Sequence, residues 1–117
     1  MKVDELFEQQ LESTLLEMAN LDVVDTGIDN VIIWVGADPH QHYLRVKVSN
    51  VPDKWSADNF TITIPELVPV GKINKQFITG QVLENIKAWI KFNLEIIKAH
   101  EEGKIGTRDF LTKIKKI

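Results

Sequence analysis

The sequence predicts an α+β fold, because helix-like and strand-like patterns of hydrophobicity occupy separate stretches of one short chain. Residues 3–19 and 79–102 carry apolar side chains at intervals of three and four, as amphipathic helices do. Residues 43–49 and 60–64 instead alternate apolar and polar side chains, which is typical of half-buried strands. We therefore expect an N-terminal helix, a three- to four-stranded antiparallel meander, a long C-terminal helix across the sheet and a short final helix.

The first predicted helix has an apolar stripe and an acidic opposite face. Glu8 and Glu12 lie opposite the stripe, where water solvates them. Asp4 and Glu5 fall in the first turn, where the helix dipole favours negative charge. The stripe is formed by Val3, Phe7, Leu11, Leu15 and Met18.

Four segments ahead of the long helix have strand character. Residues 21–24 form a short candidate strand. Residues 31–35 contain no polar position, which predicts a central strand covered on both faces. A polar loop, residues 50–59, joins the alternating strands 43–49 and 60–64, and such a connection favours an antiparallel meander.

The long helix is expected to begin at an N-cap between Asn74 and Thr79 and to end near Glu102. Two polar residues, Asn93 and His100, interrupt its apolar stripe seven positions apart. We expect Asn93 to bond a sheet-edge or loop carbonyl, because buried amides need partners. The stripe itself consists of Val82, Ile86, Trp89, Ile90 and Ile97.

Length and composition are typical of one cytoplasmic domain. Residues 1–117 are enough for a single domain with its own core. The absence of cysteine excludes disulfides, thiolate metal ligands and a cysteine nucleophile. The first residues lack the apolar stretch of a signal peptide, and no apolar run approaches the ~20 residues that span a bilayer. We therefore expect a cytoplasmic protein that does not associate with membranes.

Charge is unevenly distributed along the chain, although the net charge is only −3. Residues 1–60 hold 4 basic and 11 acidic side chains, whereas residues 61–117 hold 10 basic and 6 acidic ones. Solvated faces explain most such asymmetries. The same asymmetry would also let the acidic first helix dock onto a basic surface, or let the basic end of the chain meet an anionic partner.

Two of the three histidines, His40 and His42, stand one residue apart after an Asp-Pro turn. Strand parity directs both toward the side of the sheet that faces the long helix, which carries His100. With Asp38 or Glu101 nearby, the three imidazoles would bind zinc or another borderline metal and leave a position open for water. The alternative, which we favour, is that His40 and His42 cap the turn and that His100 lies at a frayed helix end.

An aromatic-basic pattern marks the other side of the same strand. Tyr43, Arg45 and Lys47 alternate with apolar residues and face two threonines of the neighbouring strand, an arrangement that stacks bases and holds phosphates. The negative net charge argues against a polyanionic partner. Trp55 lies in a polar loop, where it either contributes to an interface or packs over the sheet edge.

Four short stretches between residues 31 and 102 form a recognisable pattern. They are the strand 32–35, the strand start Pro39-His40-Gln41-His42, the strand 60–64 followed by Pro65-Glu66-Leu67, and the helical stretches 83–90 and 93–100. Together they resemble a small family of uncharacterised bacterial domains with a Pro-His-x-His strand start, often encoded in toxin–antitoxin-like gene pairs. This chain departs from the family in its added N-terminal helix, its long loop at 50–59 and His100, where the family more often has tryptophan. The resemblance implies a compact α+β domain in which His40 and His42 are marked positions without an established activity.

The sequence contains no signature of a known reaction. It has no Gly-x-Gly-x-x-Gly, phosphate-binding loop, Gly-x-Ser-x-Gly or His-Glu-x-x-His motif, so we predict no catalytic residue and no cofactor. We expect a non-enzymatic interaction or regulatory protein of a bacterium or mobile element, which acts through protein–protein contacts as a monomer or homodimer. The first alternative is a metal-binding protein or metal-dependent enzyme that uses the three histidines. The second is nucleic-acid binding through the aromatic-basic pattern.

Overall fold

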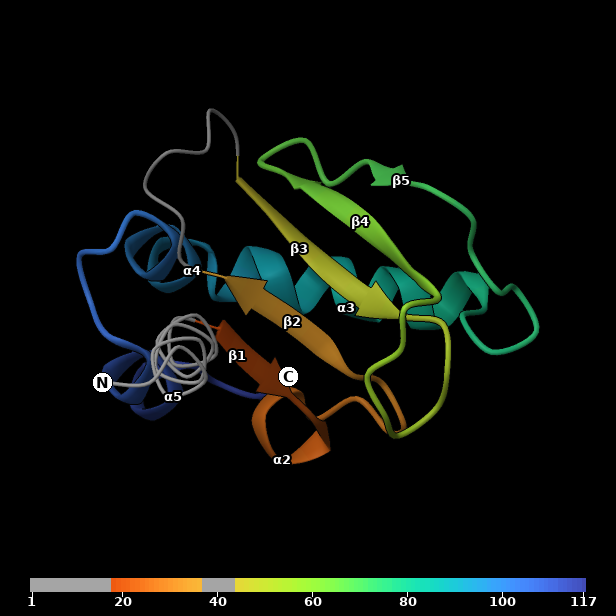
Figure 1. Cartoon of the computed structure of the whole chain (residues 1–117), viewed down its shortest axis with the longest axis horizontal. Helices are drawn as coiled ribbons and strands as arrows, with labels where there is room; N and C mark the ends of the chain where they lie inside the picture. Colours follow the sequence, from red (N-terminus) through yellow and green to blue (C-terminus); the bar gives the residue numbers. More distant parts are fainter. Residues whose placement is uncertain (1–17, 37–43) are drawn as a thin grey trace, which may run out of the picture.

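A computed structural model describes residues 18–36 and 44–117 of the chain (Figure 1). Within these ranges the chain forms one antiparallel sheet of five strands and four helices. The predicted α+β class is therefore confirmed. None of the described helices combines the length and apolar character needed to cross a membrane.

The sheet is a simple meander, in which every strand pairs with its neighbours in the sequence. Its central pair, β3 and β4, is also its longest, with six residues in each strand. Five strands are present instead of the three or four predicted, because short strands at both edges extend the meander. In order, the strands are β1 (Met18–Leu21), β2 (Ile33–Gly36), β3 (Leu44–Ser49), β4 (Asn59–Ile64) and β5 (Pro69–Val70).

The edge strand β1 begins inside the segment predicted to be the first helix. Periodicity predicts a helix over residues 3–19, but residues 18 and 19 pair with residues 36 and 35 of β2. Pairing with β2 outweighs the helical pattern at these two positions, since the strand gains a ladder of backbone hydrogen bonds. The rest of the predicted helix lies outside the described residues.

The prediction of a strand at residues 21–24 is wrong, because a helix begins inside it. The helix α2 (Val23–Thr26) follows directly after β1. Its N-cap is Asp22, whose carboxylate accepts the backbone N–H of Val24 at 2.9 Å. The carboxylate of Asp25 reaches back to accept the N–H of Asp22 at 3.2 Å, which completes a capping box.

The predicted long helix is divided in two, as α3 (Gly80–Phe92) and α4 (Leu94–Glu101). Thr79 is the N-cap of α3, since its hydroxyl accepts the N–H of Val82 at 3.3 Å, and the later of the two predicted starts is therefore the right one. The short final helix, α5 (Thr107–Lys113), follows.

Asn93 lies between α3 and α4, and the hydrogen bonds of its side chain explain why a polar residue occupies a position in the apolar stripe. Its amide nitrogen donates to the carbonyl oxygens of Trp89 at 3.1 Å and Lys115 at 2.9 Å. Its amide oxygen accepts the N–H of Lys115 at 2.8 Å. The prediction that Asn93 bonds a loop carbonyl is confirmed, and these bonds tie the C-terminal segment to the junction of the two helices.

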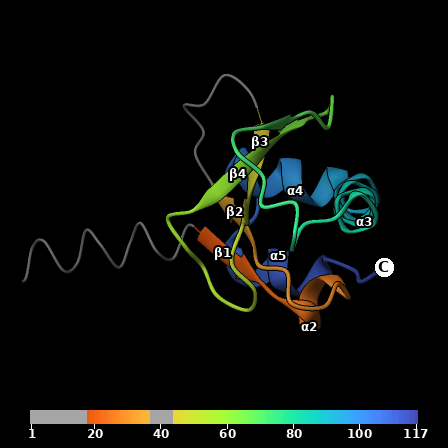
Figure 2. The same cartoon turned by 90° about the vertical axis from the view of Figure 1, so that its right-hand side faces the viewer.

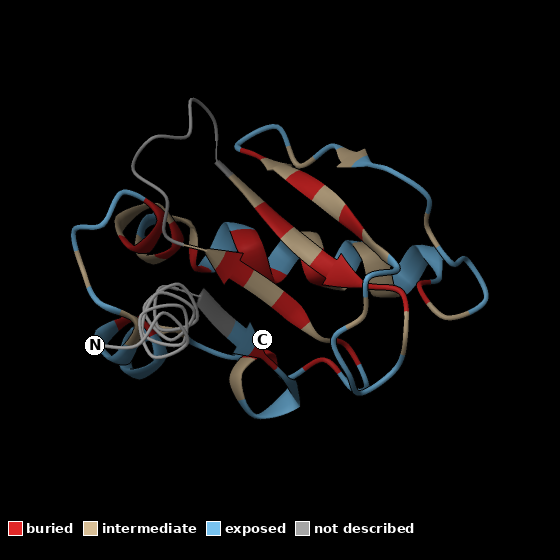
Figure 3. Ribbon diagram, viewed as in Figure 1, coloured by how far each residue is buried: buried red, intermediate tan, exposed pale blue. Residues whose placement is uncertain are grey.

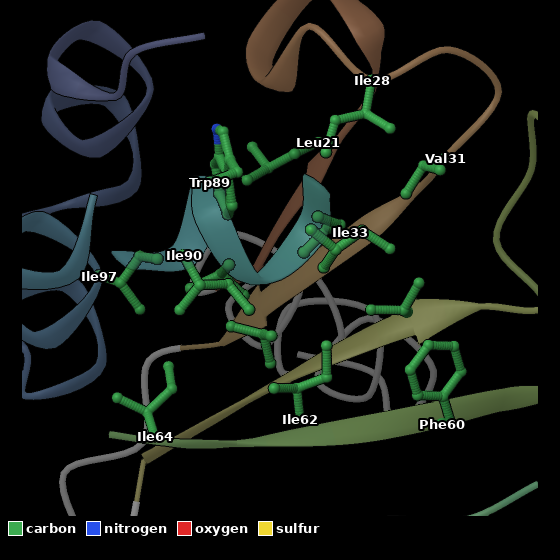
Figure 4. Packing of buried hydrophobic residues seen from close by; sticks show 14 of the residues in the cluster. Leu21, Ile28, Val31, Ile33, Phe60, Ile62, Ile64, Trp89, Ile90 and Ile97 are labelled. Atoms are coloured by element: carbon green, nitrogen blue, oxygen red, sulfur yellow. The ribbon is translucent and has the colours of Figure 1, made fainter. Parts of the chain in front are cut away.

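The helices α2, α3, α4 and α5 all lie on one side of the sheet, and the core is between them and the sheet (Figures 1 and 2). Ile33 and Ile62 point from the strands toward Trp89 and Ile90 of α3 (Figure 4). Burial alternates along the strands (Figure 3). Residues 31–35 follow the same alternation, so the prediction of a strand covered on both faces is wrong: Trp34 is only half-buried.

Candidate binding face

The face of the sheet opposite the helices carries polar and aromatic side chains. No helix among the described residues lies over it (Figure 2). The strand register places one row of side chains across all five strands, since directly paired residues point to the same face. Arg45 and Thr63 form a second pair beside that row. We call this surface the open face; its residues are Asn20, Trp34, Arg45, Lys47, Thr61, Thr63 and Val70, and Trp55 joins it from the β3–β4 loop.

Two tryptophans and a lysine form the centre of the open face. The rings of Trp34 and Trp55 stack with their centroids 6.2 Å apart and their planes at 24°. The ammonium of Lys47, directly across from Trp34 in the register, lies 5.1 Å from the centre of the Trp34 ring. Gly36 leaves room for that ring, because a Cβ atom there would lie 2.9 Å from Cη2 of Trp34. The cluster is thus built from three separate segments.

A network of hydrogen bonds fixes the loop that carries Trp55. The hydroxyl of Ser49 donates to the carbonyl of Lys54 at 2.8 Å, immediately before the tryptophan. Asp53 adopts a φ of 61° and its N–H donates to the carbonyl of Asn30 at 2.9 Å. The amide of Asn30 in turn donates to the carboxylate of Asp53 at 2.8 Å. Trp55 is therefore held in place although 36% of its surface is exposed.

The chemistry of the open face suits a ligand with both apolar and anionic groups. Its two charged side chains, Arg45 and Lys47, are both cationic. The stacked indoles offer a flat, half-exposed apolar surface next to them. Tryptophan and arginine are the residues that most often dominate binding energy at protein interfaces. A partner with aromatic or aliphatic side chains beside carboxylates would fit this combination.

The structure brings together three of the four residues predicted for an interaction site. Arg45, Lys47 and Trp55 share the open face, whereas Tyr43 lies outside the described residues. Sequence reasoning missed Trp34, the residue that both Trp55 and Lys47 contact. The alternation of side chains along a strand places Trp34 on the opposite face from Ile33 and Val35. Because residues 31–35 contain no polar position, however, they predict a strand covered on both faces, and an exposed Trp34 is not expected from them.

His100 is part of the core and does not lie at a frayed helix end. Its ring is 0% exposed and packs against Phe110, with centroids 4.5 Å apart. Nε2 lies 3.2 Å from the hydroxyl of Thr107. Burial lowers the pKa of His100, and the nearby backbone of Gly36 opposes part of that decrease, although Nδ1 has no well-aligned hydrogen-bond partner.

Glu101, the next residue of α4, is a buried carboxyl group that is 6% exposed. One of its oxygens accepts the backbone N–H of Arg45 at 3.3 Å, and the other has no hydrogen-bond partner. Burial raises the pKa of Glu101 to about 7, against the opposing effects of the Arg45 N–H and the positive charge of Arg45. This carboxyl group is therefore largely protonated below neutral pH.

The predicted metal site can be followed only in part. His40 and His42 lie outside the described residues. In residues 18–36 and 44–117, no three or more His, Asp or Glu side chains gather in an arrangement that could hold a metal ion. His100 is near Gly36, which directly precedes segment 37–43, and Glu101 is near Arg45, the second residue after that segment.

Comparison of the chain with models of known protein families, with curated proteins and with solved structures finds no match.

Proposed function

We propose that this protein is a non-enzymatic interaction protein that binds a partner protein through the open face. The observation that supports this most strongly is the stack of Trp34 on Trp55 with the Lys47 ammonium over it. A half-exposed tryptophan pair held by a fixed loop loses little conformational freedom on binding, so contacts made to it convert efficiently into affinity.

A protein partner fits this cluster better than a nucleic acid. The two indoles stack on each other, which leaves fewer ring faces for bases than separate aromatic side chains would. The net charge of −3 also weakens attraction to a polyanion. By the family resemblance, the proposed setting is the cytoplasm of a bacterium or of a cell that carries a mobile element, where the protein has a regulatory role.

The test is capture of the partner from lysate of the source cells with the intact chain and two matched variants. Trp34→Ala removes the centre of the cluster. Phe92→Ala removes another exposed aromatic side chain, 57% exposed, on a helix on the other side of the sheet. We expect Trp34→Ala to abolish capture of a defined protein and Phe92→Ala to retain it. Equal capture by both variants contradicts the proposal, as does salt-dependent retention of nucleic acid that Lys47→Ala removes.

A second candidate function is binding of a divalent metal by His40, His42 and His100. It is favoured by one observation: His100 approaches Gly36 and Glu101 approaches Arg45, and these two residues lie just before and just after the segment that contains the other two histidines. Native mass spectrometry of protein purified without chelator tests it. One metal ion per chain, lost in the variant His42→Ala, would support this function, and a metal-free chain in the presence of excess zinc would exclude it.

A further inference from the structure

Residues 1–17 and the open face have opposite charges. This segment holds five of the seventeen acidic side chains of the protein but only one of its fourteen basic ones. The open face has two charged side chains, Arg45 and Lys47, and both are cationic. Association of the two would pair charges of opposite sign, which sets orientation and suppresses wrong partners.

The same segment carries an apolar stripe that needs a surface to cover it. Its apolar positions recur with helical spacing, whereas Glu8 and Glu12 fall on the other side. Asp4 lies about 40° from the middle of the stripe, on the same side of the helix. As a helix, seventeen residues would be about 25 Å long. A sheet of five strands is about 19 Å wide, so such a helix is long enough to cross the whole open face. The stripe residues are Val3, Phe7, Leu11 and Leu15.

The place where the segment joins the sheet favours a second copy of the chain as its binding site. Residue 18 begins β1, which is an edge strand of the same sheet, so the segment would have to reverse direction to reach its own open face. Residues 12–17 contain no Gly, Pro, Asn or Asp, and Ser13 is the one residue among them whose type favours tight reversals. A reciprocal exchange between two copies needs no reversal and closes as a twofold-symmetric dimer.

We infer that the open face is covered by residues 1–17 of a second copy of this chain, and that the same exchange covers the face of the other copy. This inference rests on the proposed function, since it names the partner that the open face binds. The stripe of one copy packs on Trp34 and Trp55 of the other, and Asp4, on the same side of the helix as the stripe, lies near Arg45 and Lys47.

The test uses the full chain and exploits its lack of cysteine. A single cysteine, Gln10→Cys, sits beside the stripe and is labelled with bimane, a fluorophore that tryptophan quenches on contact. The labelled chain also carries Trp34→Phe and Trp55→Phe, so its own open face cannot quench the label, and the remaining Trp89 is fully buried. This chain is mixed with an excess of unlabelled wild-type protein. We expect loss of bimane emission, because the wild-type copy supplies the tryptophans.

Two controls make the result specific. Mixing the same labelled chain with unlabelled chain that also carries Trp34→Phe and Trp55→Phe should leave the emission unchanged. A label at Gln9→Cys, about 200° around the helix from Phe7, should be quenched less than the label at Gln10→Cys. Native mass spectrometry should show twice the 13.4 kDa chain mass for the wild type.

Charge reversal provides a second line of test. Lys47→Glu should raise the dissociation constant of the dimer, and addition of Asp4→Lys to the same chain should lower it again. Lys91→Glu, an exposed lysine of α3 on the helical side, should leave the dissociation constant unchanged.

The outcomes separate this inference from the proposed function. If the protein is a monomer at all concentrations and the label in the mixture is not quenched, the inference that a second copy covers the open face is overturned. If Trp34→Ala nevertheless abolishes capture of another protein, the proposed function stands. If a Gln10→Cys chain that keeps Trp34 and Trp55 is monomeric and its label is quenched, the second copy is also overturned, because the segment then covers its own face. A dimer that is insensitive to Trp34, Trp55 and Lys47 substitutions overturns the second copy as the occupant of the open face, and the proposed function is overturned as well only if Trp34→Ala captures the partner as well as Phe92→Ala does.

Discussion

The two faces of the sheet are built from the same strands but differ in burial and in side-chain chemistry. On the covered face, Ile33, Val46 and Ile62 are fully buried beneath the helices. On the open face, the alternate residues Trp34, Lys47 and Thr61 are only half-buried and include a cation. One register therefore produces both a core and a candidate binding surface, and substitutions one residue apart along a strand should affect different properties: stability on the covered face and binding on the open face.

The strongest test of this difference between the two faces is to truncate one tryptophan on each face. Trp89→Ala empties a fully buried site between α3 and the sheet and should lower the free energy of unfolding by about 3–5 kcal/mol. Trp34→Ala removes a half-buried ring from the open face and should cost about 1 kcal/mol. Urea denaturation followed by circular dichroism measures both.

If Trp89→Ala does not fold, Trp89→Phe supplies the same information. It keeps most of the apolar contact and removes an indole N–H that has no hydrogen-bond partner. The free energy of unfolding should therefore fall clearly less than in Trp89→Ala. Equal losses for the Trp89 and Trp34 variants would mean that the open face belongs to the core.

The covered face also holds a buried acid, and its removal should stabilise the protein. In the folded state the pKa of Glu101 is about 7, above its ordinary value of 4.5, so folding opposes ionisation of this carboxyl group. Its penalty is absent below pH 4.5, grows as the pH rises toward 7 and is constant above. Glu101→Gln should therefore match the wild type at pH 4 and be more stable by up to about 3 kcal/mol at pH 8.

The pH profile of the difference between the two proteins separates Glu101 from His100. Because burial lowers the pKa of His100, that residue costs stability as the pH falls below 6.5, the opposite direction. The effect of His100 is common to both proteins and cancels in the difference. A difference that shrinks between pH 5 and 7 would contradict the buried, protonated state of Glu101.

A smaller effect is expected at the junction of the two helices that cover the sheet. Asn93→Ala removes three hydrogen bonds and leaves the N–H and the carbonyl of Lys115 without their partner. The free energy of unfolding should fall by about 2 kcal/mol, and hydrogen exchange of the Lys115 amide should accelerate. Thr112→Ala serves as the control, since its side chain makes one exposed bond to the carbonyl of Arg108. A loss no larger than that of the control would show that Asn93 does not hold the C-terminal segment.

The fold class could be predicted because it depends on local patterns. The alternation in β3 and β4 and the helical spacing of α3 are set by residues close in sequence. The capping box of Asp22 and Asp25 was also available locally, and recognising it would have prevented the wrong strand at residues 21–24. The division of the long helix could not be predicted from nearby residues, because it depends on hydrogen bonds between Asn93 and Lys115, 22 positions away.

The two cations of the candidate site could be predicted from the sequence, but the tryptophan pair at its centre could not. Parity along β3 placed Arg45 and Lys47 on one face, as the register confirms. The contact of Trp34 with Trp55 depends on how the β3–β4 loop curves back over β2, and nothing in either segment alone specifies that path. His100 was predicted to be near the sheet end, but its burial against Phe110 of α5 depends on the packing of a later helix.

The smallest expected effect tests whether the open face contributes to stability at all. Lys47→Met keeps the aliphatic stem and removes the charge that lies 5.1 Å from the centre of the Trp34 ring. An exposed cation–π contact contributes about 0.5–1 kcal/mol, so the free energy of unfolding should fall by about that amount and tryptophan emission should shift. Lys91→Met, on the exposed side of α3, should change neither. A loss as large as that of Trp89→Ala would show that Lys47 supports the core, and the separation of stability from binding between the two faces would then fail.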